Sequence, residues 1–168
     1  MIKKLQALRA KKGFTLVELI VVIAIIGVLA AILIPTLSGV IESARKRSAE
    51  STCQSIQSAA KTFAAQVMSK TGQACTSTTT VDMDDGKGAQ TMSAYILSQV
   101  PEIGAANSTK GAAITLTNGE VTKVVYTEGA FTALWDSTNG TQGAAKAGES
   151  NPPHNEGAAT AGQVDVTG

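Results

Sequence analysis

Residues 14–34 form an apolar run that constrains this chain more than any other feature of its sequence. The run reads FTLVELIVVIAIIGVLAAILI, and Glu18 is its only charged residue. At about 1.5 Å of rise per residue, a helix over this stretch covers roughly 30 Å, the thickness of the hydrocarbon core of a bilayer. The run therefore predicts one helix that can span a membrane.

The charge of the chain is divided unevenly on the two sides of residue 13. Residues 1–13 carry five basic residues and no acidic one, whereas the remaining 155 residues carry 9 basic and 13 acidic residues. A short basic segment before an apolar run is typical of a signal that keeps the N-terminus in the cytoplasm. The net acidic body makes nucleic acid an unlikely partner, because binding to phosphates requires clustered basic residues.

Two ordinary explanations of the apolar run leave Glu18 unexplained. A secretory signal peptide has a shorter apolar region with a cleavage site of small residues after it, but here the run continues beyond Ala30 and Ala31 to Ile34. A permanent anchor gains nothing from a carboxylate, which is costly in lipid and usually marks a function. Proximity of Glu18 to the headgroups explains only why it is tolerated.

The leader, the sequence GFTLVE at residues 13–18 and the uninterrupted apolar stretch with Gly27 and Pro35 resemble the N-terminus of type IV pilins and the related pseudopilins. The resemblance implies that a prepilin peptidase cuts between Gly13 and Phe14 and methylates the new amine of Phe14. It aligns Glu18 with the family's glutamate and Pro35 with its helix-kinking proline. The family's second helix proline has no counterpart here, since Ser55 stands at that place.

The resemblance also implies a life cycle and a set of partners. The precursor is expected in the inner membrane as a single-pass protein with its N-terminus inside, and the mature chain in an extracellular helical filament of identical subunits. The implied partners are the prepilin peptidase, the pilus assembly platform and minor pilins. The expected function is a structural pilus subunit, serving adhesion, motility or DNA uptake. The alternatives are a pseudopilin of a secretion or competence system and a minor pilin that binds a ligand.

Three residues of the run are candidates for a role in assembly. Among bundled apolar helices, an unpaired Glu18 carboxylate is expensive, and the amine of Phe14 on a neighbouring subunit can neutralise it and fix the axial stagger. Gly27 permits close approach of helices or local unwinding, although it is also an ordinary residue of membrane helices. Pro35 removes one backbone hydrogen bond and is expected to kink or open the helix.

The helical pattern continues beyond Pro35 as an amphipathic segment. Residues 36–67 place apolar side chains three or four positions apart, among them Leu37, Ile41, Ile56 and Phe63. One helix is therefore predicted from about Phe14 to the mid-sixties, with residues 14–35 as the membrane and filament-core part. The second half is expected to pack against a head.

Cys53 and Cys75 follow the apolar run, in the part of the chain expected outside the cytoplasm, where a disulfide can persist. A bond between them requires the helix to end before Lys70, near Ala64–Val67, because bridged Cα atoms lie within about 7 Å. Free thiols, or pairing with other partners, are the alternatives.

The remaining sequence predicts an α+β head with a small antiparallel sheet against the helix. Residues 68–136 contain a turn-rich connection, a short helix around Tyr95 that Pro101 stops, a hairpin about Asn118-Gly119, and a third strand over 130–136. Residues 137–168 are rich in small residues and are predicted to be flexible, although QVDVT at 163–167 favours a short strand.

The sequence contains no pattern of an enzyme, a cofactor site or a metal site. Its single histidine, His154, lies in a stretch rich in proline and glycine, and the common nucleophile, phosphate-loop and zinc motifs are missing. The acids Asp82, Asp84 and Asp85 fall at positions 1, 3 and 4 of a calcium-type loop, whereas an EF-hand needs ligands at 1, 3 and 5. We therefore expect a protein without catalytic residues, bound cofactor or bound metal.

Overall fold

The computed structural model of the protein describes residues 14–105, 107–147 and 163–167. It divides after Glu42 into two units, which are considered in turn. The helix α2 (Leu16–Thr71) begins in the first unit and ends in the second, and Pro35 lies inside it. The predicted long helix is therefore confirmed. The predicted leader, residues 1–13, lies outside the described residues.

In the first unit, α2 consists almost entirely of apolar residues. A helix satisfies its backbone N–H and C=O groups internally, so it is one of the few structures that can cross the hydrocarbon part of a bilayer. An 18-residue window of α2 near the N-terminus has a mean hydropathy of 3.2, and none of it is buried. By length and composition, this part of α2 can span a membrane.

The end of α2 corrects the predicted boundary. The helix ends at Thr71, four residues beyond the predicted limit at Val67. Gly72 follows with φ of +68°, and its N–H donates to the carbonyl of Met68 at 2.9 Å. Glycine adopts this left-handed conformation without a steric cost, so it terminates helices at this position. The Thr71-Gly72 pair in the sequence is therefore the true stop signal.

In the second unit, α2 buries one narrow face. The buried positions recur every three or four residues, as expected for one side of a helix. They are Ala49, Cys53, Ile56, Ala60, Phe63 and Val67. The earlier apolar positions Leu37 and Ile41, which were predicted to belong to the same packed face, are 57% and 47% exposed. The buried face of α2 therefore begins at Ala49.

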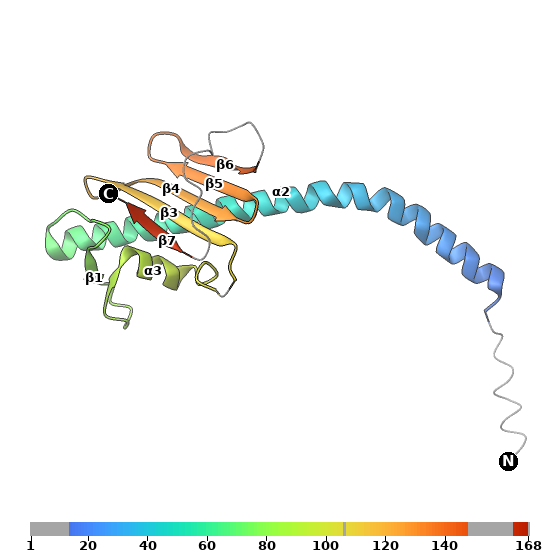
Figure 1. The fold of residues 1–168 in the computed structure, drawn as a ribbon, viewed down its shortest axis with the longest axis horizontal. Helices are drawn as coiled ribbons and strands as arrows, with labels where there is room; N and C mark the ends of the chain where they lie inside the picture. The colour runs from blue at the N-terminus through green and yellow to red at the C-terminus, as the bar shows by residue number, and fades with distance from the viewer. Residues whose placement is uncertain (1–13, 106, 148–162, 168) are drawn as a thin grey trace, which may run out of the picture. The chain divides into compact units, whose positions relative to one another are not determined.

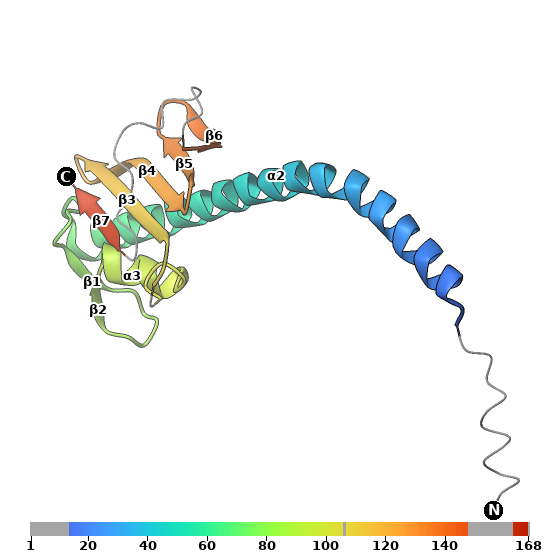
Figure 2. The same ribbon diagram turned by 45° about the vertical axis from the view of Figure 1, so that its right-hand side comes forward.

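A five-stranded sheet packs against this part of α2 in the order β6-β5-β4-β3-β7 (Figures 1 and 2). Its strands are β3 (Lys110–Thr117), β4 (Glu120–Glu128), β5 (Phe131–Asp136), β6 (Gly140–Lys146) and β7 (Val164–Thr167). Neighbours are antiparallel except that β7 runs parallel to β3. The predicted α+β class, with a sheet that is mainly antiparallel, is confirmed.

The hairpin between β3 and β4 turns at Asn118 and Gly119, as predicted. Their φ angles of +54° and +83° are both left-handed, which is the requirement of the tight turn that suits antiparallel strands. Thr117 and Glu120 face each other across this turn. The Asn-Gly dipeptide thus sets the register of the two central strands.

The short helix predicted around Tyr95 is α3 (Met92–Gln99). Thr91 caps its first turn, because the Thr91 hydroxyl accepts a hydrogen bond from the N–H of Ala94 at 3.3 Å. Met92 and Ile96 are buried on one face of α3. Two short strands, β1 (Thr80–Asp82) and β2 (Ala89–Thr91), pair before α3 in a stretch that was predicted only as turns.

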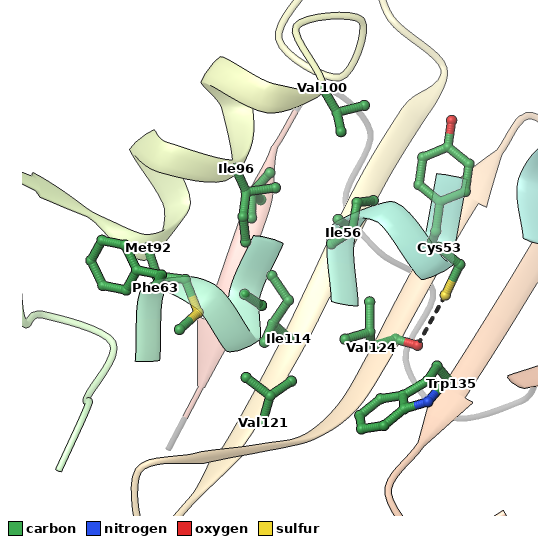
Figure 3. Close-up of a cluster of buried hydrophobic side chains, with 14 of the residues drawn as sticks. Cys53, Ile56, Phe63, Met92, Ile96, Val100, Ile114, Val121, Val124 and Trp135 are labelled. Atoms are coloured by element: carbon green, nitrogen blue, oxygen red, sulfur yellow. Dashed lines mark hydrogen bonds between the residues drawn. The ribbon is translucent and has the colours of Figure 1, made fainter. Parts of the chain in front are cut away.

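The core of the second unit joins both helices to the sheet (Figure 3). Figure 3 shows Ile56 and Phe63 of α2 and Ile96 of α3 facing Ile114 and Val124 of the sheet. These five side chains are at most 1% exposed. Burial of apolar side chains of this size contributes about 1.5–3 kcal/mol each, so the core is the main source of stability of this unit.

The C-terminal region corrects the prediction of flexibility in part. Residues 140–146 form β6, and its position is fixed because the Glu50 carboxylate on α2 accepts a hydrogen bond from the N–H of Ala144 at 2.7 Å. Residues 164–167 form β7, which confirms the predicted short strand. The stretch 148–162, including His154, lies outside the described residues.

Asp136 organises the turn between β5 and β6. Its carboxylate accepts hydrogen bonds from the backbone N–H groups of Thr138 and Asn139, at 2.8 and 2.6 Å, and from the amides of Asn139 and Gln142. The backbone bond from Asn139 is the main reason that the pKa of Asp136 is lowered from its ordinary value. These bonds favour the charged form of the carboxylate.

The Asp136 network predicts a pH-dependent stability. The pKa of Asp136 is lower in the folded state than in the unfolded state. Its contribution to the free energy of unfolding is therefore fully present above the pKa of the unfolded state, near 4, and is lost as the pH falls through the pKa of the folded state. We expect Asp136→Asn to lower the denaturation midpoint at pH 6, and the difference from the native chain to shrink towards pH 3. Fluorescence of Trp135, the single tryptophan, reports the unfolding. A difference independent of pH would contradict this assignment.

Candidate functional site

The apolar side chains of the first unit have no cover among the residues that the structure describes. The large apolar residues between Phe14 and Ile41 are all exposed, from 44% at Val22 to 81% at Phe14. Soluble monomers rarely expose contiguous apolar surface of this length, and such surface marks contact with a membrane or with another protein. Residues 14–41 are therefore the candidate functional surface, which we call the apolar rod.

Thr15 and Glu18 form a reciprocal cap at the start of the apolar rod. The Glu18 carboxylate accepts hydrogen bonds from the backbone N–H and the hydroxyl of Thr15, both at 2.8 Å. The backbone N–H of Glu18 in turn donates to the Thr15 hydroxyl at 3.3 Å. This arrangement is a capping box, which satisfies N–H groups that the first turn of a helix leaves free.

The capping box adds a residue that the sequence analysis missed. Thr15 was quoted as part of the resembling segment but was given no role, although its spacing of three residues before Glu18 is the known sequence signal of such a cap. Thr15 holds the carboxylate at the helix start, next to the position of the Phe14 amine. The cap therefore fixes where the one acidic group of the apolar rod is presented.

Pro35 lies within α2 and is followed by two hydroxyl side chains that bond to the helix backbone. The Thr36 hydroxyl donates to the carbonyl of Leu33 at 2.9 Å, and the Ser38 hydroxyl donates to the carbonyl of Ile34 at 3.2 Å. Proline has no N–H to donate, and side-chain hydroxyls are a usual means of satisfying carbonyls near prolines in membrane helices. Thr36 and Ser38 therefore add side-chain hydrogen bonds to the helix turn that contains Pro35.

Gly27 lies in the middle of the apolar rod. A side chain at this position would meet no other atom within 4 Å, and the same is true of Gly39 further along the helix. Within the described part of the chain, nothing therefore requires a glycine at either position. A requirement for glycine at position 27 would have to come from contact with another molecule.

Cys53 and Cys75 are buried free thiols in the second unit. The Cys53 thiol donates to the carbonyl of Val124 at 3.6 Å (Figure 3). The helix continues to Thr71, about 27 Å from Cys53, and the four residues from there to Cys75 can return at most about 14 Å. The condition for the disulfide considered from the sequence, a helix that ends before Lys70, is therefore not met in the structure.

The burial of the two thiols predicts low reactivity. Burial raises the pKa of Cys53 to about 12 and also raises that of Cys75, which keeps both as unreactive thiols at neutral pH. We expect a polyethylene-glycol maleimide to modify neither cysteine in the folded protein at pH 7.5, and to modify both after unfolding without reductant. Modification that requires reductant would establish a disulfide instead.

The acidic turn between β1 and β2 holds a lysine. The ammonium of Lys70, near the end of α2, donates to the carbonyl of Asp82 and to the carboxylate of Asp84, both at 2.6 Å. Across the described ranges, no group of three or more histidine, cysteine, aspartate or glutamate residues is placed to hold a metal ion. Two of the three acids that were compared with a calcium loop, Asp82 and Asp84, thus anchor the turn to α2, whereas Asp85 accepts a hydrogen bond from the amide of Gln90.

The structure places the predicted site residues in two groups. Phe14, Glu18, Gly27 and Pro35 all lie on the apolar rod, whereas Cys53 and Cys75 lie in the second unit. Gly13, on the leader side of the predicted cleavage position, lies outside the described residues. The candidate site is therefore a helix surface with a capped acidic start, a form suited to assembly.

Comparison with known proteins gives one match, at this same surface. Residues 8–34 match the family described as the prokaryotic N-terminal methylation motif. No curated protein and no solved structure matched the chain. The match begins in the leader and ends just before Pro35, so it covers Phe14, Glu18 and Gly27. The chain thus carries the type IV pilin signature at residues 8–34, a segment that includes the apolar start of the long helix α2, and the resemblance to type IV pilins and pseudopilins is confirmed over this segment.

Proposed function

We propose that this protein is the structural subunit of a type IV pilus, which polymerises through the apolar rod. The observation that carries the proposal is the coincidence of the methylation motif with the apolar rod, whose large apolar side chains are all exposed. Such a surface is stable in lipid before assembly and among like helices after it. The second unit then forms the outer surface of the filament.

In this proposal, the leader of residues 1–13 stays in the cytoplasm and the rod crosses the inner membrane once. A prepilin peptidase cuts between Gly13 and Phe14 and methylates the Phe14 amine. An assembly platform, primed by minor pilins, then moves the subunit from lipid into the filament. The carboxylate of Glu18 pairs with the Phe14 amine of a neighbour, because either charge left alone among apolar helices is costly. No catalytic step is assigned to the subunit.

Mass spectrometry of filaments sheared from cells tests the proposal. We expect the sheared fraction to consist mainly of this chain, beginning at Phe14 and carrying one added methyl group on its amine. A chain that still begins at Met1, or that occurs only as single molecules, would refute the proposal. A mature chain that is missing from sheared filaments but retained with the cells would identify a pseudopilin.

Gly27 offers a test of helix packing with a matched control. Gly27→Ala and Gly39→Ala each add a methyl group in open space and each favour the isolated helix by about 1 kcal/mol. If close helix contacts at the centre of the rod hold the filament, Gly27→Ala should lower filament yield several-fold, while Gly39→Ala should leave it near the native level. Equal yields from the two variants, measured in the sheared fraction, would remove this role of Gly27.

A further inference from the structure

A groove runs between α2 and α3 in the second unit. It has a volume of about 550 Å³ and is open to solvent along one side. Its walls come from two elements, the stretch of α2 between Ser51 and Thr62 and the end of α3 with Tyr95 and Gln99. The volume is within the usual range for small-molecule sites, about 300–1,000 Å³. Neither the apolar rod nor the methylation motif includes any of these residues.

The lining of the groove is polar but uncharged. Among the described residues, none of the nine that line the groove is acidic or basic. Seven of the nine carry a hydroxyl or an amide group on the side chain. This composition selects against ions. A charged ligand buried here would lack a compensating partner, and nucleic acid would lack the basic residues that bind phosphate.

The polar groups of the groove are arranged to serve as both acceptors and donors. The hydroxyl groups of Ser55 and Thr62 donate hydrogen bonds to backbone carbonyls of the same helix, with oxygen–oxygen distances of 3.0 and 2.8 Å. Their hydroxyl oxygens therefore remain available as acceptors. The amides of Gln54 and Gln99 add donors and acceptors, and Gln54 is steadied by a bond to the Thr141 hydroxyl at 3.3 Å. A neutral ligand with many hydroxyl groups matches such a set, because each hydroxyl both donates and accepts.

Tyr95 supplies an aromatic surface beside these polar groups. Its ring packs against Phe63 with centroids 5.8 Å apart and planes at 36°, so its position is fixed by the core. The side chain is only partly buried and lines the groove. An aromatic ring with one exposed side offers apolar contact, and the phenol adds a polar tip. The C–H faces of a sugar ring require this kind of surface.

We propose that the groove between α2 and α3 binds a neutral sugar, as one or two residues of a glycan. The proposal goes beyond assembly and does not depend on it, because every lining residue lies in the second unit. Gln99 and Gln54 hydrogen-bond the hydroxyl groups, and Tyr95 contacts the ring. In a filament, many such weak sites on one surface would act together, since avidity multiplies the effect of single contacts.

Binding of defined sugars to the full-length mature chain tests the proposal. The chain is held in dodecylphosphocholine micelles, which contain no sugar, and is titrated with lactose, cellobiose, diacetylchitobiose and the acidic sialyllactose by saturation-transfer NMR. We expect saturable binding of at least one neutral disaccharide. Loss of one hydrogen bond in Gln99→Ala should weaken it about five-fold, whereas Gln73→Ala, an exposed glutamine outside the groove, should not change it.

Three results would overturn the proposal. The first is that no neutral sugar binds saturably at concentrations up to the millimolar range, and the second is that only sialyllactose binds. The third is that Gln99→Ala and Gln73→Ala weaken sugar binding equally. Trp135 fluorescence shows that each variant is folded. Gln99→Glu provides a second variant, because it keeps the size of the side chain and its acceptor oxygen but removes the amide donor, and it should weaken binding of the neutral sugars if that donor bonds their hydroxyl groups.

Discussion

A chain with Glu18→Gln should be cleaved and inserted like the native chain but should yield at least ten-fold fewer filaments. Glutamine retains the acceptor that a capping box needs, so the helix start is preserved. The negative charge is lost, and the Phe14 amine of the neighbour then has no partner among apolar helices. Removing one partner of a buried ion pair costs about 3–5 kcal/mol, so the loss of filament yield should be at least ten-fold. Immunoblots of sheared and cell-bound fractions measure the yield.

Thr15→Ala is the control that separates the cap from the charge. It removes the hydroxyl that bonds Glu18 but leaves the carboxylate in place. Loss of an N-cap costs about 1 kcal/mol, which a long helix in lipid tolerates. We expect filament yield from Thr15→Ala to stay within a few-fold of the native level. The opposite outcome, with Glu18→Gln normal and Thr15→Ala defective, would show that Glu18 serves the helix start and not the pairing of subunits.

The sequence predicted those parts of the molecule whose cause is local. The apolar run can be identified as a helix from its own residues, without knowledge of what it packs against. Asn118-Gly119 determines its own turn because both residues accept left-handed φ angles. The end of α2 was missed for the opposite reason. Apolar periodicity stops at Val67, since Met68 is 52% exposed, but the helix continues on its own hydrogen bonds until Gly72. Periodicity reports burial, and a helix can extend beyond its buried face.

The strand β6 and the pairing partner of β7 could not be predicted, because their causes are distant in the chain. The sequence of β6, GTQGAAK, lacks the alternation of a strand, and its position depends on pairing with β5 and on the hydrogen bond that the N–H of Ala144 donates to the Glu50 carboxylate. The parallel pairing of β7 with β3 joins residues about fifty positions apart. A groove such as that between α2 and α3 likewise exists only after two separate helices have packed.

For the candidate site, the sequence analysis identified Glu18 but missed Thr15, its partner in the capping box. Glu18 could be singled out, because a charge in an apolar run needs an explanation. The bonds that hold its carboxylate to Thr15 are also local, so the spacing of the two residues was sufficient to predict them. The exposure of Leu37 and Ile41 was not predictable in this way. Their spacing fits a packed face, and only the position of the sheet decides that burial begins at Ala49.

Gly119→Ala should destabilise the second unit more than any other glycine substitution in the β3–β4 and β4–β5 turns. A Cβ at position 119 would lie 2.7 Å from the Cβ of Ala74 and 2.8 Å from the backbone nitrogen of Cys75. Its φ of +83° adds the cost of a left-handed residue, about 1–2 kcal/mol, and overpacking against backbone adds about 1–3 kcal/mol. The total expected loss of unfolding free energy is about 2–5 kcal/mol.

Gly129→Ala is the matched control, because Gly129 is also left-handed, with φ of +59°, but a Cβ there would meet nothing within 4 Å. Gly129→Ala should lower the free energy of unfolding only by the cost of the left-handed conformation, about 1–2 kcal/mol. Denaturant titration followed by Trp135 fluorescence measures both. Since the clash at position 119 displaces the loop of Ala74 and Cys75, the Cys75 thiol should also become reactive to maleimide in Gly119→Ala but not in Gly129→Ala. Equal stability and equal protection of Cys75 in the two variants would show that the hairpin turn does not hold that loop in place.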